Sequence, residues 1–123
     1  MCGIFGFSLK RRLISSDVKN GLGQLTRLSH RGPDGQGQAV FNEQGVFIGH
    51  RRLAILDVSD SAAQPMTRHG LTLAHNGEIY NFIEIRKSLE KQGFHFTTES
   101  DTEVLLSAWS HYGLKCLDLF DGM

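Results

Sequence analysis

Cys2 is the residue in this sequence with the clearest capacity for covalent chemistry. Removal of Met1 would leave its thiol on the N-terminal residue, beside a free α-amine. A free α-amine has an ordinary pKa of about 7.7–8.0 and a thiol one of about 8.5, so the amine can accept the thiol proton near neutral pH. One residue then supplies both nucleophile and general base, as in N-terminal threonine enzymes. The alternative is a small buried apolar residue.

The dipeptide Asn76-Gly77 could supply an oxyanion hole for such a nucleophile. A side-chain amide beside a glycine N–H offers two hydrogen-bond donors to a developing negative charge. The same dipeptide is also typical of a hairpin turn. Residues 78–81 predict the start of a helix rather than a second strand, which disfavours the turn.

Arg52, Asp101 and Glu78 suggest a site for the charged end of an amino acid. Each residue has an ordinary interpretation by itself: Arg52 as a strand-end ion pair, and Asp101 as a favourable acid in the first turn of a helix. Arginine binds a carboxylate through two parallel hydrogen bonds, and acidic side chains bind an ammonium group. An arginine together with two acids therefore suits a zwitterionic ligand.

The composition excludes several other function classes. The chain has 13 basic and 13 acidic residues, so its net charge gives no sign of nucleic-acid or membrane binding. It has no apolar run near the roughly 18 residues of a membrane helix, and no secretory signal. Its two cysteines make no disulfide framework, and its six histidines show no zinc spacing. We expect a cytosolic protein without a metal site.

The elements that must position these residues are short. Strands are predicted over residues 3–9, 38–41, 46–49, 52–57, 71–75 and 94–97. Helices are predicted over residues 18–28 with Ser16 as cap, over 81–92 with Asn81 as cap, and from a capping box at 100–103 to residue 112, followed by helical turns over 114–120. Gly93 and Gly113 are the predicted helix ends. Strands that neighbour in sequence, with helices grouped later, favour an α+β layered fold.

Two details of the predicted helices are open to a structural test. Gly21 and Gly23 each weaken the first helix by about 1 kcal/mol relative to alanine. In the last helix, the spacing of the apolar residues predicts that one face points inward, formed by Val104, Leu105, Ala108, Trp109 and Tyr112.

With these motifs in view, the sequence resembles the N-terminal glutaminase domain of asparagine synthetase-type enzymes, which are class II glutamine amidotransferases. The matching motifs occur in family order over the whole chain, at residues 1–6, 31–35, 52–57, 64–66, 76–81, 100–104 and 119–123. Glu99 is a departure, since relatives often have a small residue there.

The resemblance implies an N-terminal-nucleophile hydrolase. Cys2 would attack the side-chain amide of glutamine, form a glutamyl thioester and release ammonia, after which water would release glutamate. Asn76 and the N–H of Gly77 would form the oxyanion hole. The loop at residues 31–35 would lie near the nucleophile.

The resemblance also implies a set of glutamine-binding residues. They are Arg52 for the α-carboxylate, Glu78 and Asp101 for the α-amine, Asn76 and Gly77 at the amide, and Leu53, Ala54, Ile55 and Leu56 along the pocket. Arg51 precedes Arg52, so a shift of one position is the alternative register. We prefer Arg52 because residues 53–55 follow it as in the family.

The family fold is an αββα four-layer sandwich of antiparallel sheets. We expect residues 1–123 to be the N-terminal part of a type-2 glutamine amidotransferase domain, with an incomplete sandwich. The remainder of that domain and an ATP-dependent synthetase domain are expected downstream. No cofactor is expected in this segment, whereas ATP and magnesium belong to the synthetase domain. The implied partners are L-glutamine, that synthetase domain and, as a further option, a second copy of the chain.

Other functions stay open at this point. The chain could be a truncated or unprocessed domain that binds glutamine or a protein without turnover, because a retained Met1 would turn the Cys2 amine into an amide. It could also be an amidotransferase whose acceptor differs from aspartate. Relatives that make amino sugars or purine precursors carry a different motif around the carboxylate-binding arginine.

Overall fold

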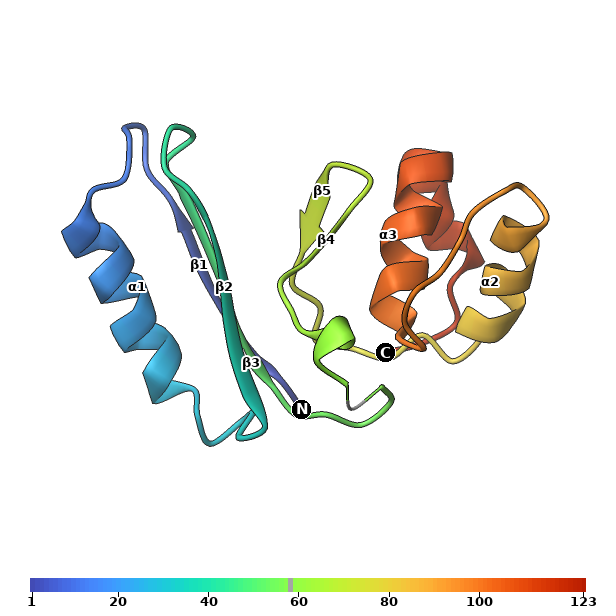
Figure 1. Cartoon of the computed structure of the whole chain (residues 1–123), viewed down its shortest axis with the longest axis horizontal. Helices are drawn as coiled ribbons and strands as arrows, with labels where there is room; N and C mark the ends of the chain where they lie inside the picture. Colours follow the sequence, from blue (N-terminus) through green and yellow to red (C-terminus); the bar gives the residue numbers. More distant parts are fainter. Residues whose placement is uncertain (58) are drawn as a thin grey trace. The chain divides into compact units, whose positions relative to one another are not determined.

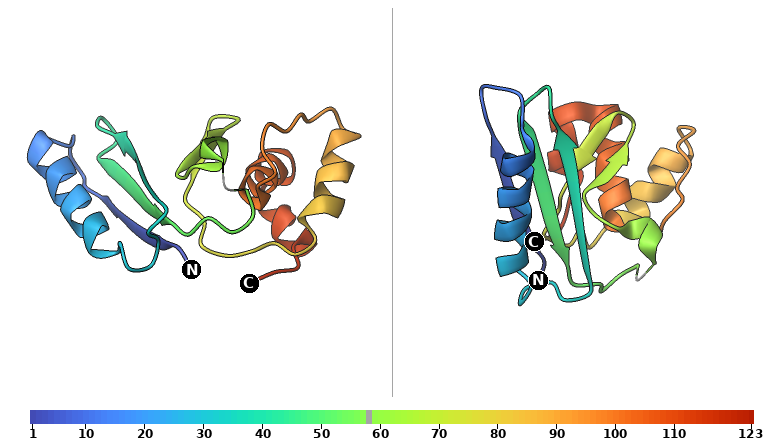
Figure 2. Two further views of the ribbon diagram at one scale, coloured as in Figure 1. Left: turned by 60° about the horizontal axis from the view of Figure 1, so that its bottom comes forward. Right: turned by 60° about the vertical axis from the view of Figure 1, so that its left-hand side comes forward.

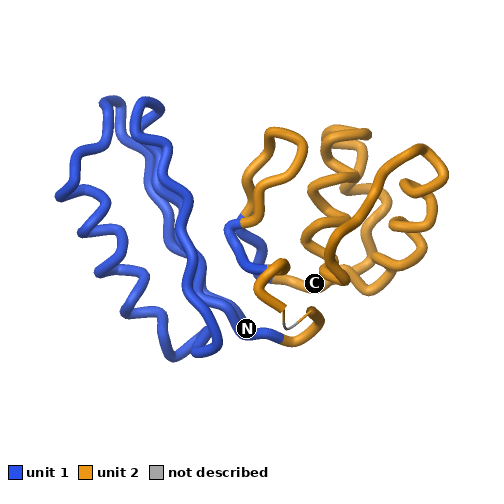
Figure 3. The backbone as a smooth tube through the Cα atoms, viewed as in Figure 1, with its two compact units in different colours: residues 1–54, 63–65, 74–76 blue, residues 55–62, 66–73, 77–123 orange. Residues whose placement is uncertain are grey.

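The computed structural model describes residues 1–57 and 59–123, which form two compact units (Figures 1 and 3). Unit 1 consists of Met1–Ala54, Ala63–Pro65 and Ala74–Asn76, and unit 2 consists of Ile55–Ala62, Met66–Leu73 and Gly77–Met123. Together the described residues form a mixed α+β structure with antiparallel sheets, as predicted. Among these residues no helix is both long enough and apolar enough to cross a membrane.

Unit 1 is built on an antiparallel sheet with strand order β1-β3-β2. The strands are β1 (Gly3–Ser8), β2 (Gly35–Phe41) and β3 (Val46–Arg52). The predicted hairpin between residues 38–41 and 46–49 is confirmed. Gly45, in the turn, has φ of +69°, a conformation that glycine adopts without steric cost.

Helix α1 (Ser15–Arg27) covers one face of this sheet, as Figure 2 shows. Leu25 and Phe47 are fully buried in the interface, and the ring of Phe7 stacks on Phe47 with centroids 5.4 Å apart. A Cβ on Gly21 would lie 2.9 Å from the Phe47 ring. The helix therefore approaches the sheet closely through Gly21, a packing role that outweighs the low helix propensity of glycine.

The predicted Ser16 cap of this helix is wrong. The N-cap is Ile14, whose backbone N–H donates to the Asp17 carboxylate (2.9 Å). Arg11 also donates two hydrogen bonds to Asp17, at 2.6 and 2.9 Å. These bonds from Arg11, followed by the bond from Ile14, lower the pKa of Asp17 from 3.8 to about 2. An acid in the first turn thus supplies the cap that serine was expected to give.

The predicted buried strand over residues 52–57 is also wrong beyond its first residue. Strand β3 ends at Arg52, and Ile55 and Leu56 are 66% and 42% exposed. The reason is local: the N–H of Leu53 points to the Cys2 sulfur and that of Ala54 to the Asp34 carboxylate, so neither joins a strand ladder.

Unit 2 is mainly helical. Its elements are the 3₁₀ helix η1 (Asp60–Ala62), the hairpin β4 (Met66–Arg68) and β5 (Leu71–Leu73), the helices α2 (Phe82–Glu90) and α3 (Asp101–Tyr112), and the 3₁₀ helix η2 (Gly113–Leu119). Helix α3 contacts α2, η2 and the hairpin. The core between them contains Ile79, Ile85, Leu89, Val104, Ala108 and Cys116.

The predicted ends of α2 and α3 are largely confirmed. Gly93 follows α2 with φ of +92°, and Gly113 ends α3 with φ of +57°. Ser100 caps α3 by accepting from Thr102 N–H (3.2 Å). Asn81 stands at the N-cap of α2, but its side chain makes no cap bond there. Instead it donates to Leu119 O (2.9 Å) and accepts from Asp121 N–H (3.0 Å).

Three further predictions for unit 2 are wrong. Residues 94–97 form no strand, since the N–H of Thr97 donates to the Glu103 carboxylate instead of a neighbouring strand. That use of Glu103 also prevents the second half of the predicted capping box. Trp109 is 36% exposed and does not point inward with Val104 and Ala108.

Candidate active site

Cys2 lies at the end of the sheet in unit 1 where β1 starts and β3 ends. The antiparallel register pairs Gly3 with Arg51, so the residue before β1 meets the residues after β3. The Cys2 sulfur lies 3.4 Å from the backbone nitrogen of Leu53 and 3.7 Å from its carbonyl oxygen. The side chain is half-buried. The structure thus brings together two residues of the predicted site, Cys2 and Leu53.

The loop between α1 and β2 ties this corner together. Arg31 Nε donates to the carbonyl of Cys2 (3.1 Å). Asp34 accepts from Ala54 N–H through its carboxylate (2.9 Å), while its own N–H donates to the carbonyl of Arg52 (3.0 Å). A Cβ on Gly32 would overlap the backbone of Arg51, so only glycine allows this approach. The loop therefore fixes the main chain on both sides of Arg52.

The two neighbouring arginines have different surroundings. Arg51 donates from Nε to the carbonyl of Gly32 (3.0 Å) and from Nη1 to the side-chain oxygen of Gln36 (2.9 Å). Its guanidinium thus supports the loop and the start of β2. Arg52 is the last residue of β3, half-buried, and lies on the opposite face of the strand. Arg51 is therefore a structural part of this corner of unit 1.

Asn76 belongs to unit 1 and is exposed, at the end of the short segment Ala74–Asn76. The preceding residue, His75, is held by two side chains. Its N–H donates to Gln64 Oε1 (2.6 Å), and its carbonyl accepts from His50 Nε2 (3.2 Å). His50 is fully buried. Burial lowers the pKa of His50, the hydrogen bond to His75 opposes this, and the charges of Arg52 and His75 add to the lowering.

Gly77, Glu78 and Asp101 belong to unit 2. Glu78 forms two backbone hydrogen bonds with Met123, each 2.9 Å long. Asp101 is 6% exposed, and its Oδ2 accepts from the N–H of Ile79 (3.0 Å). The Asp101 carboxylate is therefore bonded to the residue that follows Glu78. The structure brings these two predicted amine-binding residues into one neighbourhood.

Ile55 and Leu56, predicted to line the glutamine pocket, also belong to unit 2. Leu56 lines a surface cavity of about 400 Å³ together with side chains of α2 that include Phe82, Ile83 and Arg86. None of the other predicted site residues lines this cavity.

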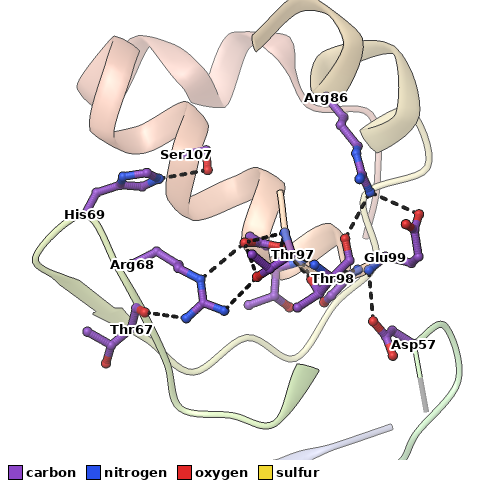
Figure 4. Close-up of polar contacts among 12 residues, drawn as sticks. Asp57, Thr67, Arg68, His69, Arg86, Thr97, Thr98, Glu99 and Ser107 are labelled. Atoms are coloured by element: carbon purple, nitrogen blue, oxygen red, sulfur yellow. Dashed lines mark hydrogen bonds and ion pairs between the residues drawn. The ribbon is translucent and has the colours of Figure 1, made fainter. Parts of the chain in front are cut away.

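Sequence reasoning missed the environment of Glu103, which Figure 4 shows in part. This buried carboxylate, 2% exposed, accepts from the N–H and hydroxyl groups of Thr97 and Thr98 and from Arg68 Nε (3.2 Å). Burial raises the pKa of Glu103, but the bonds from Thr98 and Thr97 outweigh it and the pKa is lowered. The interpretation of residues 100–103 as a capping box hid this role.

Residues 98 and 99 are held from a second direction. Arg86 Nη1 donates to the carbonyl of Thr98 and to the carboxylate of Glu99, both at 3.0 Å. The N–H of Glu99 donates to Asp57 Oδ2 (2.9 Å). Glu99, the predicted departure from the family, is thus part of the bonding that fixes the segment before Asp101.

The predicted site residues are divided between the two units. Unit 1 carries Cys2, Arg52, Leu53, Ala54 and Asn76, and unit 2 carries Ile55, Leu56, Gly77, Glu78 and Asp101. Over residues 1–57 and 59–123, no group of three or more His, Cys, Asp or Glu side chains is placed to hold a metal ion.

Comparison with known proteins bears directly on the function of such a site. The model of the family described as "Glutamine amidotransferase domain" matches residues 1–123. The chain is 40% identical to asparagine synthetase [glutamine-hydrolyzing] 1 of Bacillus subtilis, over 100% of this chain and 20% of the relative. It is 38% identical to a probable asparagine synthetase of Schizosaccharomyces pombe and 37% identical to asparagine synthetase B of Escherichia coli, in both cases over 100% of this chain and 22% of the relative.

The chain spans about a fifth of the length of these relatives, and the match lies over its whole sequence. The family model and the relatives agree with the motifs found along the sequence. The chain belongs to the glutamine amidotransferase domain family.

Proposed function

We propose that this chain is the N-terminal part of the glutamine-hydrolysing domain of an asparagine synthetase-type enzyme, with Cys2 as its nucleophile. The observation that carries the proposal is the position of the Cys2 sulfur, 3.4 Å from the nitrogen of Leu53. This contact puts the thiol beside the end of β3, next in sequence to Arg52. A thiol and an arginine at the same end of the sheet suit an amino-acid substrate: the arginine can bind its α-carboxylate while the thiol attacks its side chain.

The reaction begins when removal of Met1 frees the α-amine of Cys2. This amine takes the thiol proton, and the thiolate attacks the side-chain amide carbon of glutamine. The carbon–nitrogen bond breaks, the departing nitrogen receives the proton, and ammonia leaves. Water then attacks the resulting thioester and releases glutamate and the free thiol.

Each remaining residue has a role set by its chemistry. Asn76 and the N–H of Gly77 donate hydrogen bonds to the oxyanion that forms at the attacked carbon. Arg52 binds the α-carboxylate of glutamine, and Glu78 and Asp101 bind its α-amine. Residues 53–56 line the glutamine pocket. The bond between Asp101 and Ile79 supports the pairing of the two acids.

The proposal extends to a larger protein, and the family membership of residues 1–123 supports it. The complete domain is an αββα four-layer sandwich to which residues 1–123 contribute, and a synthetase domain that binds ATP and magnesium uses the ammonia. Aspartate is the default acceptor, and another carboxylate is the second candidate. A second copy of the chain remains a further candidate partner.

The test is glutamine hydrolysis by the full-length protein that contains this chain, after Met1 removal has been verified by intact mass, because residues 1–123 alone could be inactive. We expect Cys2→Ala to abolish ammonia release because no other group supplies the nucleophile, while the far-ultraviolet circular dichroism stays unchanged. Cys116→Ala is the matched control, since Cys116 is the other free thiol and lies in the core of unit 2. Undiminished hydrolysis by the Cys2→Ala protein would overturn the mechanism.

A chain that retains Met1 tests the alternative without turnover. Its Cys2 nitrogen is an amide and accepts no proton, so the proposal predicts loss of hydrolysis with glutamine binding preserved. Equal hydrolysis with and without Met1 would show that the α-amine is not the base.

A further inference from the structure

The backbone of His75, the residue before Asn76, is held in an unusual way. Both of its main-chain groups bond to side chains: the N–H to Gln64 Oε1 (2.6 Å) and the carbonyl to His50 Nε2 (3.2 Å). All four residues belong to unit 1. We call His50 and Gln64, with these two bonds, the His75 clamp.

The clamp rests on the sheet. In the antiparallel register, His50 of β3 lies opposite Ile4 of β1 and Gly37 of β2. The same Gly37 accommodates the main chain of Gln64, because a Cβ there would overlap the Gln64 carbonyl oxygen. Both halves of the clamp thus start from the same row of the sheet, and His50 is fully buried within it.

The geometry assigns one protonation form to His50. A carbonyl oxygen can only accept, so Nε2 carries the proton that is donated to His75. Nδ1 is buried and, within residues 1–57 and 59–123, has no hydrogen-bond partner. A second proton there would place a buried unpaired cation beside Arg52, whose charge already disfavours it. The ring is therefore neutral, with its proton on Nε2.

We propose that His50 is a positioning residue for glutamine hydrolysis: with Gln64, its neutral Nε2–H form fixes the His75–Asn76 peptide group and so aims Asn76 at the oxyanion. The peptide unit is planar, so a bond that holds the His75 carbonyl also holds the N–H of Asn76. The role rests on the proposed function, which makes Asn76 an oxyanion donor. Because the oxyanion forms only in the transition state, the clamp acts on kcat rather than on KM.

Two substitutions of His50, by glutamine and by asparagine, test whether the position of the N–H donor matters rather than the loss of the imidazole ring. The side-chain nitrogen of glutamine stands as many bonds from Cβ as Nε2 of histidine does, whereas that of asparagine matches Nδ1. We therefore expect His50→Gln to keep kcat within about threefold. His50→Asn should lower kcat about ten- to hundredfold, the range expected for a misplaced catalytic group, with KM unchanged. His95→Gln, at an exposed position in unit 2, is the matched control.

Two results would overturn the role in hydrolysis: equal losses of kcat in both His50 variants, or a rise in KM that accounts for the loss. A variant that fails to fold does not decide the matter, because the remaining readout uses the unsubstituted chain. There, ¹⁵N NMR of the His50 ring should show a proton on Nε2 and none on Nδ1. A proton on Nδ1 would refute the clamp.

Failure of the clamp and failure of the proposed function are distinguishable. If the Met1-free full-length protein does not hydrolyse glutamine, the proposed function fails, but the ring NMR and the exchange rate of the His75 amide, which donates to Gln64, still report on the clamp. We expect His50→Asn to speed that amide exchange at least tenfold while His50→Gln leaves it unchanged. Unchanged exchange in both variants would contradict the clamp.

Discussion

The two units of the chain hold their candidate site residues by different means. In unit 1, Cys2 lies just before β1: its sulfur contacts the main chain of Leu53, and its carbonyl accepts from the side chain of Arg31. In unit 2, Asp101 follows a segment whose N–H groups bond to a buried carboxylate, Glu103, paired with Arg68. The first arrangement uses polar groups that the sheet already exposes at its end. The second requires a charge taken out of water.

This difference teaches which substitutions should affect chemistry and which should affect stability. Strand register places Cys2 and Arg52, so removing their side chains leaves the ladder intact. The carboxylate of Glu103 is an internal part of unit 2, so removing it exposes no catalytic group but leaves several buried donors unpaired. Substitution of Cys2 or Arg52 should therefore leave the stability of unit 1 nearly unchanged. Substitution of Glu103 should destabilise unit 2.

The largest expected effect is in unit 2. We expect Glu103→Ala to lower the free energy of unfolding by about 3–5 kcal/mol, because it leaves Arg68 and the N–H groups of Thr97 and Thr98 without their buried acceptor. Urea denaturation measures the loss. Glu90→Ala is the matched control at an exposed position of α2 and should cost about 0.5 kcal/mol or less. Similar losses in the two variants would show that the buried network contributes little.

The next effect is on binding, in unit 1. Arg52→Ala should weaken glutamine binding about ten- to hundredfold, since a charge-assisted hydrogen bond is worth about 1.5–3 kcal/mol. Arg51→Ala should weaken it far less, because the Arg51 guanidinium bonds to Gly32 and Gln36. Isothermal titration of the Cys2→Ala chain with glutamine measures both. Equal effects, or the reverse order, would mean that the register is wrong by one position.

A smaller effect comes from two glycines of α1. Gly21→Ala brings a Cβ within 2.9 Å of the Phe47 ring, and we expect it to cost about 1–3 kcal/mol through overpacking. Gly23→Ala meets no described atom within 4 Å and should stabilise the chain by about 0.5–1 kcal/mol through helix propensity. Thermal unfolding separates the two. Stabilisation by both would contradict the close packing of α1 on the sheet.

The smallest effect is a difference in acid sensitivity between the units. The pKa of His50 lies below its ordinary 6.5, so the unfolded chain takes up this proton first and the stability of unit 1 falls as the pH drops below about 6.5. The pKa of Glu103 lies below its ordinary 4.5, so the corresponding loss in unit 2 begins only below about 4.5. Hydrogen-exchange protection, measured separately for β3 and α3, should decline first in β3. Loss of protection in β3 and α3 at the same pH would contradict the expected difference in acid sensitivity between the two units.

The sequence predicted the parts of this structure that depend on local patterns. The hairpin at residues 42–45 and the ends of α2 and α3 at Gly93 and Gly113 follow from turn and cap chemistry. Cys2, Arg52 and Asp101 could be proposed as candidate site residues because their side-chain chemistry follows from residue type alone. The positions of these elements in sequence also sufficed to favour an α+β fold.

The rest depends on contacts between residues far apart in the chain. The apolar run over residues 53–56 resembles a strand, but the carboxylate of Asp34 and the sulfur of Cys2 take the N–H groups that a strand would use. The sequence pattern makes Glu103 half of a capping box, but in the structure its carboxylate accepts from Thr97 and Thr98 instead. Gly21 resembles a weak point of a helix until the Phe47 ring is placed against it.

The central claim is that Cys2, with its own α-amine as general base, is the nucleophile that attacks the side-chain amide of glutamine. Its most direct test is the intact mass of the Met1-free full-length protein, quenched with acid during turnover of glutamine. We predict a population that carries one glutamyl group on Cys2, with ammonia in solution exceeding glutamate by the amount of that adduct. Ammonia release without any adduct in the chain, and unchanged in Cys2→Ala, would contradict the claim.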